Sequence, residues 1–287
     1  MIAGRRLIGI SITEERAGSS LAETETTAKL DDGYVVLSGR KAFTTGGRDF
    51  GSFLVMARFG GTGVRGLGGV IVDTETPGFS VERTIPKMGG NAIEEAAIRF
   101  DGCRVPADQV LAPGDPQSTS GFKLMMQAYN QLRCGIAAIC LGVAQAALDE
   151  IGTHLTTRHQ SGVPLASFQG LRWRVAELAA DLEAARLLTY RAAQLSDALG
   201  FPTQYETALA KLAASRLAVQ AADEAVQMLG WRGVAREFPA ERRYREVRGW
   251  TIAGGTTEAL LEVVGARVLR HYAPDADTGN GHRPSPP

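Results

Sequence analysis

The sequence predicts an α+β fold, in which an N-terminal β-barrel or β-sandwich domain is followed by a C-terminal antiparallel four-helix bundle. Two observations predict it. Apolar residues come in short strand-like runs over roughly the first 110 residues and follow a helical period after Phe122. The segment between these patterns, LAPGDPQSTSG, is typical of a linker. We therefore expect domains at 1–113 and 114–272, and a disordered polar tail at 273–287.

The N-terminal part contains short runs rich in Val, Ile, Leu and Phe. Turn residues such as DDG, TGG, GGTG and TPG separate them. Short strands that follow one another this closely favour a sandwich or small barrel over alternating βαβ units. The expected strands are LIGISI, YVVLSG, SFLVMARF, GGVIVDT and AAIRF.

The C-terminal part contains four segments with apolar residues every three to four positions. The first begins at Phe122, and the others cover approximately 168–199, 205–229 and 256–271. Short connections between long helices predict an antiparallel bundle. The second and third segments are rich in alanine, which gives an apolar face wider than one bundle core needs. We therefore expect a homo- or hetero-oligomer that forms through the bundle.

The composition excludes several classes of function. Lys and Arg number 31, as do Asp and Glu, so no basic excess suggests nucleic acid or an anionic membrane. No segment has the pattern of a signal peptide or a membrane span, and we expect a cytoplasmic protein. The three cysteines and four histidines have no metal-ligand spacing, so we expect reduced thiols and no metal site.

Several local sequences are more distinctive than the overall pattern. They occur in this order: ITEERAGSS, SGRKAFTTGG, MGGNAIEEAAIRFDGCRVPADQVLAP, LRCGIAAICLGVAQAALDE, VQMLGWRGVAREFPAERRYREVR and AGGTTEALLEVV. In sequence and order they resemble the acyl-CoA dehydrogenase flavoprotein family from about residue 10 to residue 269. The resemblance implies FAD as cofactor, an N-terminal flavin-binding β-domain and a C-terminal bundle that builds the family's tetramer.

The resemblance also implies a set of cofactor-binding residues. Polar groups near the flavin stabilise the charge of its reduced ring, and an apolar wall covers one face of the ring. On the ring side these residues are Thr13, Gly18, Ser19, Phe43 and Thr45. Arg158 corresponds to an arginine that reaches the pyrophosphate of FAD across a subunit boundary, and Gln227 to a glutamine that touches the cofactor of the neighbouring subunit. Thr256 corresponds to a threonine beside the active site, which we also expect to cap the last helix.

The sequence departs from the family where the general base should be. The family's base is a glutamate directly before a G-T-[ST]-E segment, or in some members on the first bundle helix. These positions hold Gly254 and Leu132, neither of which accepts a proton. Glu258 is a weak substitute, because we expect its carboxylate to interact with the helix N-terminus. Two cofactor positions also differ, since Ser161 replaces an aromatic and Trp231 replaces a glycine.

Three functions remain open at this point. The chain could be a subunit that oxidises an acyl thioester, on CoA or on a carrier protein, with a partner chain that supplies the base and the family's N-terminal helical domain. It could be a repurposed enzyme that catalyses an elimination or a cyclisation. It could also be a non-catalytic binding subunit. The retained flavin-side residues argue against the third function, and Gly254 and Leu132 argue against a self-sufficient dehydrogenase.

Overall fold

The computed structural model describes residues 3–272, and the predicted disordered tail at 273–287 lies outside them. The chain divides into two compact units, Met1–Ala128 and Tyr129–Pro287. The division falls within the first long helix, whereas the sequence-based boundary lies at residue 113. The domain boundaries therefore stay a prediction, and each unit is described separately below.

The first unit is built on an eight-stranded mixed sheet with the strand order β6-β7-β3-β2-β4-β5-β8, while β1 pairs with β4. Most neighbours are antiparallel, but β1 and β2 pair with β4 in parallel. The predicted β structure of the N-terminal part is present, in the form of a mixed sheet. Closure into a barrel is not confirmed, because β6 and β8 end the order of paired strands. The strands are β1 Ile8–Ser11, β2 Thr27–Asp31, β3 Tyr34–Thr45, β4 Ser52–Arg58, β5 Leu67–Asp73, β6 Phe79–Thr84, β7 Glu95–Pro106 and β8 Val110–Ala112.

The core of the first unit is formed by alternate residues of the strands, as the period of two requires. Phe53 stacks on Phe79 at 5.9 Å between ring centroids, and Phe79 meets the Phe100 ring edge-on at 5.8 Å. Phe53 and Phe100 are almost completely buried. This packing fixes the central strands β3, β4 and β7, and β3 and β7 carry the candidate site described below.

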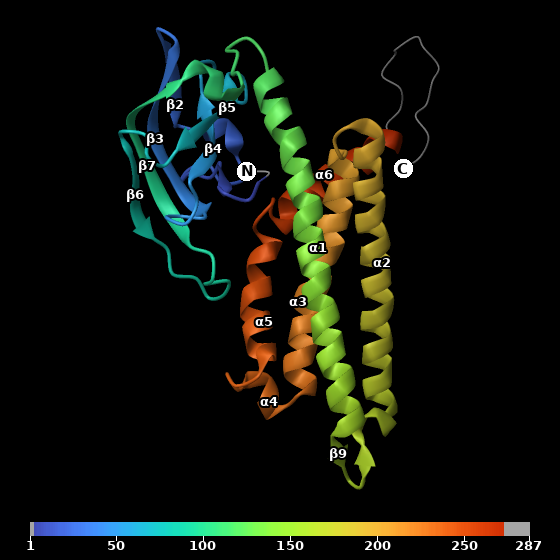
Figure 1. The fold of residues 1–287 in the computed structure, drawn as a ribbon. Coiled ribbons are helices and arrows are strands. Elements are labelled where there is room, and N and C mark those ends of the chain that lie inside the picture. Colours follow the sequence, from blue (N-terminus) through green and yellow to red (C-terminus); the bar gives the residue numbers. More distant parts are fainter. Residues whose placement is uncertain (1–2, 273–287) are drawn as a thin grey trace. The chain divides into compact units, whose positions relative to one another are not determined.

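The second unit is helical, and α2 and α3 run side by side in it (Figure 1). All four predicted helices are present. The structure adds the short helices α4 and α5, so a plain four-helix bundle is not confirmed. Helix α5 lacked an apolar signal because PAERRYREV is mostly charged, although Pro239 is a typical first helical residue. The helices are α1 Ser120–Thr157, α2 Gln169–Leu199, α3 Gln204–Met228, α4 Trp231–Val234, α5 Pro239–Val247 and α6 Thr257–Tyr272, with a hairpin of β9 His159–Gln160 and β10 Val163–Pro164 between α1 and α2.

Small residues dominate the core of α3. The helix is packed by α2, α5 and α6, and side chains as small as alanine allow helices to approach closely. Three polar residues, Thr207, Lys211 and Ser215, are also fully buried on this helix. The buried alanines are Ala208, Ala210, Ala214, Ala218, Ala221, Ala222 and Ala225.

Helix α1 is long and apolar enough to cross a membrane by length and composition alone. Its most apolar 18-residue window has a mean hydropathy of 1.6, and 33% of that window is buried. The expectation that no segment has this composition was therefore wrong. One such helix is weak support for a membrane, because a core helix of a soluble bundle, rich in Ala, Ile and Leu, has the same composition.

Candidate functional site

The predicted flavin wall lies on an irregularity of strand β3. The register between β3 and β7 shifts between Lys41 and Thr44, and Phe43 has a φ of +52°. A positive φ is costly for an aromatic residue, and bulges redirect side chains near functional sites. The Phe43 side chain is consequently 60% exposed, although Lys41 and Thr44 on either side of it are buried. The bulge thus presents an aromatic side chain to solvent.

Thr13 is fixed beside this bulge through its backbone. The Ala42 amide donates a hydrogen bond to the Thr13 carbonyl at 2.8 Å, immediately before Phe43. Gly18 and Ser19 lie further along the loop after β1, and both are exposed. The structure therefore brings Thr13 and Phe43 together, and it leaves Gly18 and Ser19 at the surface of the loop that carries Thr13.

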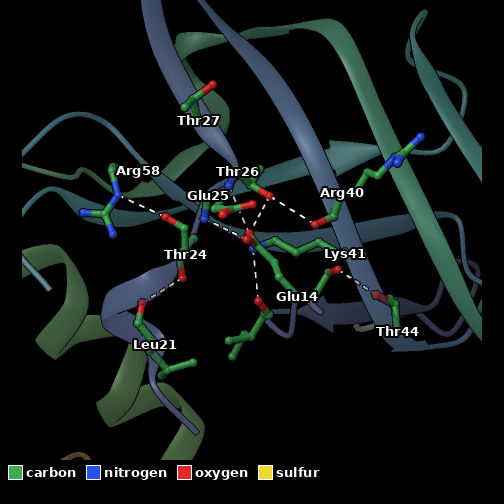
Figure 2. Close-up of polar contacts among 12 residues, drawn as sticks. Glu14, Leu21, Thr24, Glu25, Thr26, Thr27, Arg40, Lys41, Thr44 and Arg58 are labelled. Atoms are coloured by element: carbon green, nitrogen blue, oxygen red, sulfur yellow. Dashed lines mark hydrogen bonds and ion pairs between the residues drawn. The ribbon is translucent and has the colours of Figure 1, made fainter. Parts of the chain in front are cut away.

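A buried ion pair anchors this loop to the sheet (Figure 2). The Lys41 ammonium donates to Glu14 Oε1 at 2.7 Å and to the Ile12 carbonyl at 3.0 Å. The Glu14 carboxylate also accepts hydrogen bonds from the Glu25 amide at 2.7 Å and from the Thr26 hydroxyl at 2.6 Å. Lys41 is 1% exposed and Glu14 is 6% exposed. The residues on both sides of Thr13 are therefore held by contacts inside the protein.

The two charges of this pair stabilise each other. Burial lowers the pKa of the Lys41 ammonium to about 8, against the opposing effect of Glu14. Burial also raises the pKa of the Glu14 carboxyl. The Lys41 charge and the hydrogen bonds from Lys41, Thr26 and Glu25 outweigh this effect, so the Glu14 pKa lies below its usual value. At neutral pH both groups are charged.

Thr45 lies at the end of β3, directly opposite Glu95, the first residue of β7. Its hydroxyl donates to Glu95 Oε1 at 2.7 Å, and the Lys87 ammonium lies 3.7 Å from the same oxygen. Within the described part of the chain, the other carboxylate oxygen, Oε2, is buried without a hydrogen-bond partner. Burial raises the pKa of Glu95 above its usual value, although Thr45 and Lys87 oppose this effect.

In the second unit, buried cations hold the loop before α6. Arg133 Nε donates to the Gly254 carbonyl at 2.9 Å, and Arg133 Nη1 donates to Asn130 Oδ1 at 2.8 Å. The Lys211 ammonium donates to the Gly255 carbonyl at 2.7 Å. Lys211 is fully buried, and burial lowers its pKa to about 8. Two consecutive carbonyls are thus fixed by two positive charges.

The backbone at Gly254 suits glycine for a local reason. Its φ of +77° lies in the left-handed region, and the φ of the following Gly255 is +102°. A Cβ atom at residue 254 would also lie 2.5 Å from Ile136 Cδ1. Leu132, the other predicted base position, is 41% exposed on α1 beside Arg133. Neither position carries a group that accepts a proton.

Thr256 caps helix α6, as the sequence predicted, because its Oγ1 accepts a hydrogen bond from the Ala259 amide at 3.2 Å. Arg158 and Gln227, by contrast, are exposed. Arg158 directly follows α1, and between Arg133 and residue 157 this helix rises about 36 Å. One chain therefore does not bring Arg158 into contact with the loop before α6.

The exposed Trp231 begins the short helix α4, separated by two residues from the end of α3 at Met228. Arg232 of the same helix lies close enough to His154 to lower the pKa of that imidazole, after burial, which has the larger effect. The C-terminal end of α1, which Arg158 follows, and the C-terminal end of α3, which contains Gln227, therefore lie at the same end of the second unit. Among the described residues, no group of His, Cys, Asp and Glu side chains could hold a metal ion.

Comparison with known families agrees with this arrangement. The family model for the acyl-CoA dehydrogenase middle domain matches residues 9–103, and the model for the acyl-CoA dehydrogenase C-terminal domain matches residues 119–269. The chain belongs to the acyl-CoA dehydrogenase family. Its mixed sheet followed by helices is consistent with the fold of this family.

Individual acyl-CoA dehydrogenase relatives match almost the whole chain. A 3-sulfinopropanoyl-CoA desulfinase from Paraburkholderia xenovorans is 38% identical over 91% of the chain and 66% of its own length. The mitochondrial short-chain specific acyl-CoA dehydrogenase from Rattus norvegicus is 36% identical over 94% of the chain and 64% of its own length. The structure of butyryl-CoA dehydrogenase from Megasphaera elsdenii superposes with a TM-score of 0.88 at 33% identity, over 94% of this chain and 70% of that one. The chain thus spans slightly less than two thirds of these sequence relatives.

Membership of the acyl-CoA dehydrogenase family implies FAD, and the residues in the first unit fit its ring. An exposed aromatic side chain, Phe43, lies on a bulge whose backbone is fixed by Thr13 and Lys41. The Thr45 hydroxyl is exposed at the end of the same strand. A flat apolar ring with polar edges needs such a combination of groups. The assignment of these residues to FAD stays a prediction.

Sequence reasoning did not single out Glu14, Lys41, Glu95 or Lys211. Glu14 lies in the family-like segment ITEERAGSS and Lys41 in SGRKAFTTGG, and for Lys41 a charge within a strand was an available signal. Lys211 shares one helical face with Ala208 and Ser215, so helical spacing alone places a charge on the buried side of α3. For Glu95, no such signal exists, because its contact with Thr45 depends on strand register.

Proposed function

We propose that this chain is an acyl-CoA dehydrogenase-like flavoprotein subunit that binds FAD and takes part in the oxidation of an acyl thioester, on CoA or on a carrier protein. The observation that carries this proposal is the Phe43 bulge, flanked by Thr13 and Thr45 and anchored by the buried Glu14–Lys41 pair. Phe43 is an exposed aromatic residue with a strained backbone next to a buried ion pair, and this combination supports a ligand-binding role better than a packing role.

Each residue has a specific part in this proposal. Phe43 covers one face of the flavin, while Thr13 and Thr45 place polar atoms near its edges. In the usual family reaction, the bound flavin accepts a hydride from the substrate. Arg133 and Lys211 hold the loop at Gly254 and Gly255. In most family members this loop carries the glutamate that removes the proton from the substrate.

We further propose that a partner chain is needed for this oxidation, because Gly254 and Leu132 cannot accept the proton. A missing general base typically costs about 10²–10⁴-fold in rate. The alanine-rich faces of the helices and the predicted contacts of Arg158 and Gln227 with a neighbouring subunit's cofactor support an oligomer. The partner is another family member that carries the base, because a second copy of this chain would have Gly254 and Leu132 at the same positions.

The test is purification from the native host, with an absorbance spectrum and a mass-spectrometric inventory of co-purifying chains. We expect a flavin spectrum and a second acyl-CoA dehydrogenase family chain. Anaerobic addition of a panel of acyl-CoAs should bleach the flavin of the complex and leave the isolated chain unchanged. A colourless protein that does not take up FAD would refute the cofactor, and bleaching by the isolated chain would refute the need for a partner.

A second candidate is an elimination on an acyl thioester. One observation favours it: one similar protein is, by its name, a 3-sulfinopropanoyl-CoA desulfinase. An elimination needs a leaving group on the substrate and leaves the flavin oxidised. The isolated chain would then convert an acyl-CoA with a leaving group at its β-carbon without any lasting change in flavin absorbance. Failure of the isolated chain to convert 3-sulfinopropanoyl-CoA or a comparable substrate would leave the first proposal as the better one.

A further inference from the structure

The contact between Thr45 and Glu95 requires a hydrogen between its two oxygens. Thr45 Oγ1 and Glu95 Oε1 lie 2.7 Å apart, which is the distance of an O–H···O hydrogen bond. While Glu95 is ionised, Thr45 must supply this hydrogen, because a carboxylate only accepts. A threonine hydroxyl has a single hydrogen, so it cannot donate to Glu95 and to a ligand at the same time. The carboxylate and a ligand therefore compete for one hydrogen.

The backbone keeps the two side chains in contact. Thr45 and Glu95 are directly paired across β3 and β7, so they project on the same face of the sheet. The Ile85 amide donates to the Glu95 carbonyl at 2.7 Å, and the Gly46 amide donates to the Glu94 carbonyl at 2.8 Å. Because both strands are held at this point, Glu95 stays beside Thr45 when a ligand meets the exposed hydroxyl.

The surroundings of the Glu95 carboxyl offer few other hydrogens. Its side chain is 17% exposed, and Oε2 has no hydrogen-bond partner among the residues that the structure describes. The Lys87 ammonium lies 3.7 Å from Oε1, but it donates its hydrogen bond to the Ile93 carbonyl at 2.8 Å. Burial raises the pKa of Glu95, and the Thr45 hydrogen bond and Lys87 oppose this effect. If Thr45 gives its hydrogen to a ligand, one of these opposing effects is lost and the pKa rises further.

In the proposed function, the exposed Phe43 and Thr45 side chains meet the flavin ring. Hydrogen-bond donors at the edge of this ring stabilise the charge that it carries when reduced, so Thr45 is required as a donor. We propose that Glu95 is a positioning residue that takes up a proton from solvent when FAD binds and donates it to Thr45 Oγ1, which frees the Thr45 hydrogen for the ring. Hydrogen bonds then lead from Glu95 through Thr45 to the flavin edge. This inference rests on the proposed binding of FAD.

The proposal fixes the direction of the pH dependence. Binding that takes up a proton is favoured in acid, where Glu95 is already protonated in the free chain. Above the pKa of Glu95 in the free chain, the dissociation constant of FAD should rise by up to about tenfold per pH unit, the limit for one proton. The rise should end above the higher pKa that Glu95 has in the complex.

The experiment is a titration of the FAD-free full chain with FAD between pH 5 and pH 7.5, followed by flavin fluorescence. For the unmodified chain we expect the dissociation constant to rise on the order of tenfold across this range. Calorimetry at pH 7 in two buffers with different heats of ionisation should show a net uptake of protons on binding. This second measurement detects the proton directly.

Two positions test the path of the proton. Glu95→Gln provides an amide hydrogen for Thr45 at every pH, so it should bind FAD about as tightly as the unmodified chain does at pH 5, without a pH step and without proton uptake. Thr45→Val should weaken binding and also remove the step. Thr45→Ser keeps the hydroxyl and should retain both the affinity and the step.

The matched control is Glu94→Gln, one residue away. Glu94 accepts a hydrogen bond from the Arg48 amide at 2.9 Å and lies 3.7 Å from the Arg48 guanidinium, so its loss should leave the pH step unchanged. Circular dichroism of each variant without FAD checks that the sheet is intact.

The outcomes separate this inference from the proposed function. A pH step that persists in Glu95→Gln would arise from another group, such as His154, and would overturn the inference. Binding by the unmodified chain that is independent of pH, or that tightens as the pH rises, would overturn it as well. In each of these cases the proposed function stands, whereas an unmodified chain that binds no FAD at any pH would overturn both.

Discussion

Among the residues that the structure describes, three buried cations donate to backbone carbonyls of loops. Lys41 binds the Ile12 carbonyl, Arg133 binds that of Gly254, and Lys211 binds that of Gly255. Lys41 also forms a salt bridge with a buried carboxylate, that of Glu14 (Figure 2). A buried charge is tolerated when it is paired or fully hydrogen-bonded, and removing its partner is then costly. At the scale of residues, these charges fix the loop after β1 in the first unit and the loop before α6 in the second.

Replacement of Glu14 tests how much the ion pair with Lys41 stabilises the loop after β1. We expect Glu14→Gln to lower the free energy of unfolding by about 3–5 kcal/mol at pH 7, because it leaves the Lys41 ammonium buried without its counter-charge. Urea denaturation at several pH values measures this difference. Since the Lys41 pKa is already lowered to about 8, the penalty should shrink as the pH rises past it and Lys41 becomes neutral. Glu15→Gln, at the exposed neighbouring position, is the control and should change little.

The unmodified chain should also lose stability in acid through this pair. The Glu14 pKa is lower in the folded protein than its usual value. Its contribution is therefore fully present above that usual value and is lost as the pH falls through the lowered one. In denaturation curves from pH 6 to pH 3, Glu14→Gln should fall less steeply than the unmodified chain. Parallel curves would show that Glu14 does not titrate as proposed.

Substitution of Gly254 tests whether the loop before α6 tolerates a side chain at this position. Its φ of +77° costs a residue with a Cβ about 1–2 kcal/mol, and Ile136 must also move. We expect Gly254→Ala and Gly254→Glu to lower the melting temperature by similar amounts, since both carry a Cβ. With FAD bound, only Gly254→Glu should gain acyl-CoA-dependent bleaching of the flavin. A glutamate variant as stable as the unmodified chain would show that this loop accepts a side chain without strain.

At the scale of elements, each helix end and strand irregularity has a local cause. The last helix begins where Thr256 accepts the Ala259 amide, and β3 bulges where Phe43 takes a positive φ. Helix α5 begins at Pro239 and carries the pair Glu241–Arg245 at a distance of 2.7 Å. Such exposed pairs contribute little. Packing of α5 against α3, which buries Ala240 and Val247, accounts for its presence.

The cap at Thr256 gives a prediction at this scale. Thr256→Ala removes the acceptor for the Ala259 amide and should cost about 1 kcal/mol of stability without FAD. Thr256→Ser keeps the hydroxyl and should retain most of it. Denaturation of both variants in urea measures the difference. Equal stability of all three proteins would show that the α6 terminus is held by the buried cations alone.

At the scale of the whole molecule, the exposed side of α2 carries large apolar side chains. Trp173 is 61%, Leu187 66% and Tyr190 62% exposed. At 100° per residue they fall within an arc of roughly 100° on the helix. Neighbouring exposed apolar residues on one helix face commonly mark an interface. Together with the alanine-rich cores, they favour assembly through the helical unit.

We expect the chain to be oligomeric at micromolar concentration by light scattering. Leu187→Arg should shift the mass towards the monomer, because it places a charge within this apolar face. Arg216→Glu, a change of charge at another exposed helix position, is the control for general electrostatic effects. A monomeric mass for the unmodified chain would refute the assembly.

The sequence by itself determined the family, the change from strands to helices along the chain, the four long helices and the Thr256 cap. These features depend on local pattern and residue type, and they are readable from neighbours in the chain. The tertiary structure alone decided that Glu14 meets Lys41, that Thr45 meets Glu95, and that Lys211 holds Gly255. These contacts depend on strand register and helix packing between distant segments. A periodic pattern shows which face of an element is buried, but not which group it meets there.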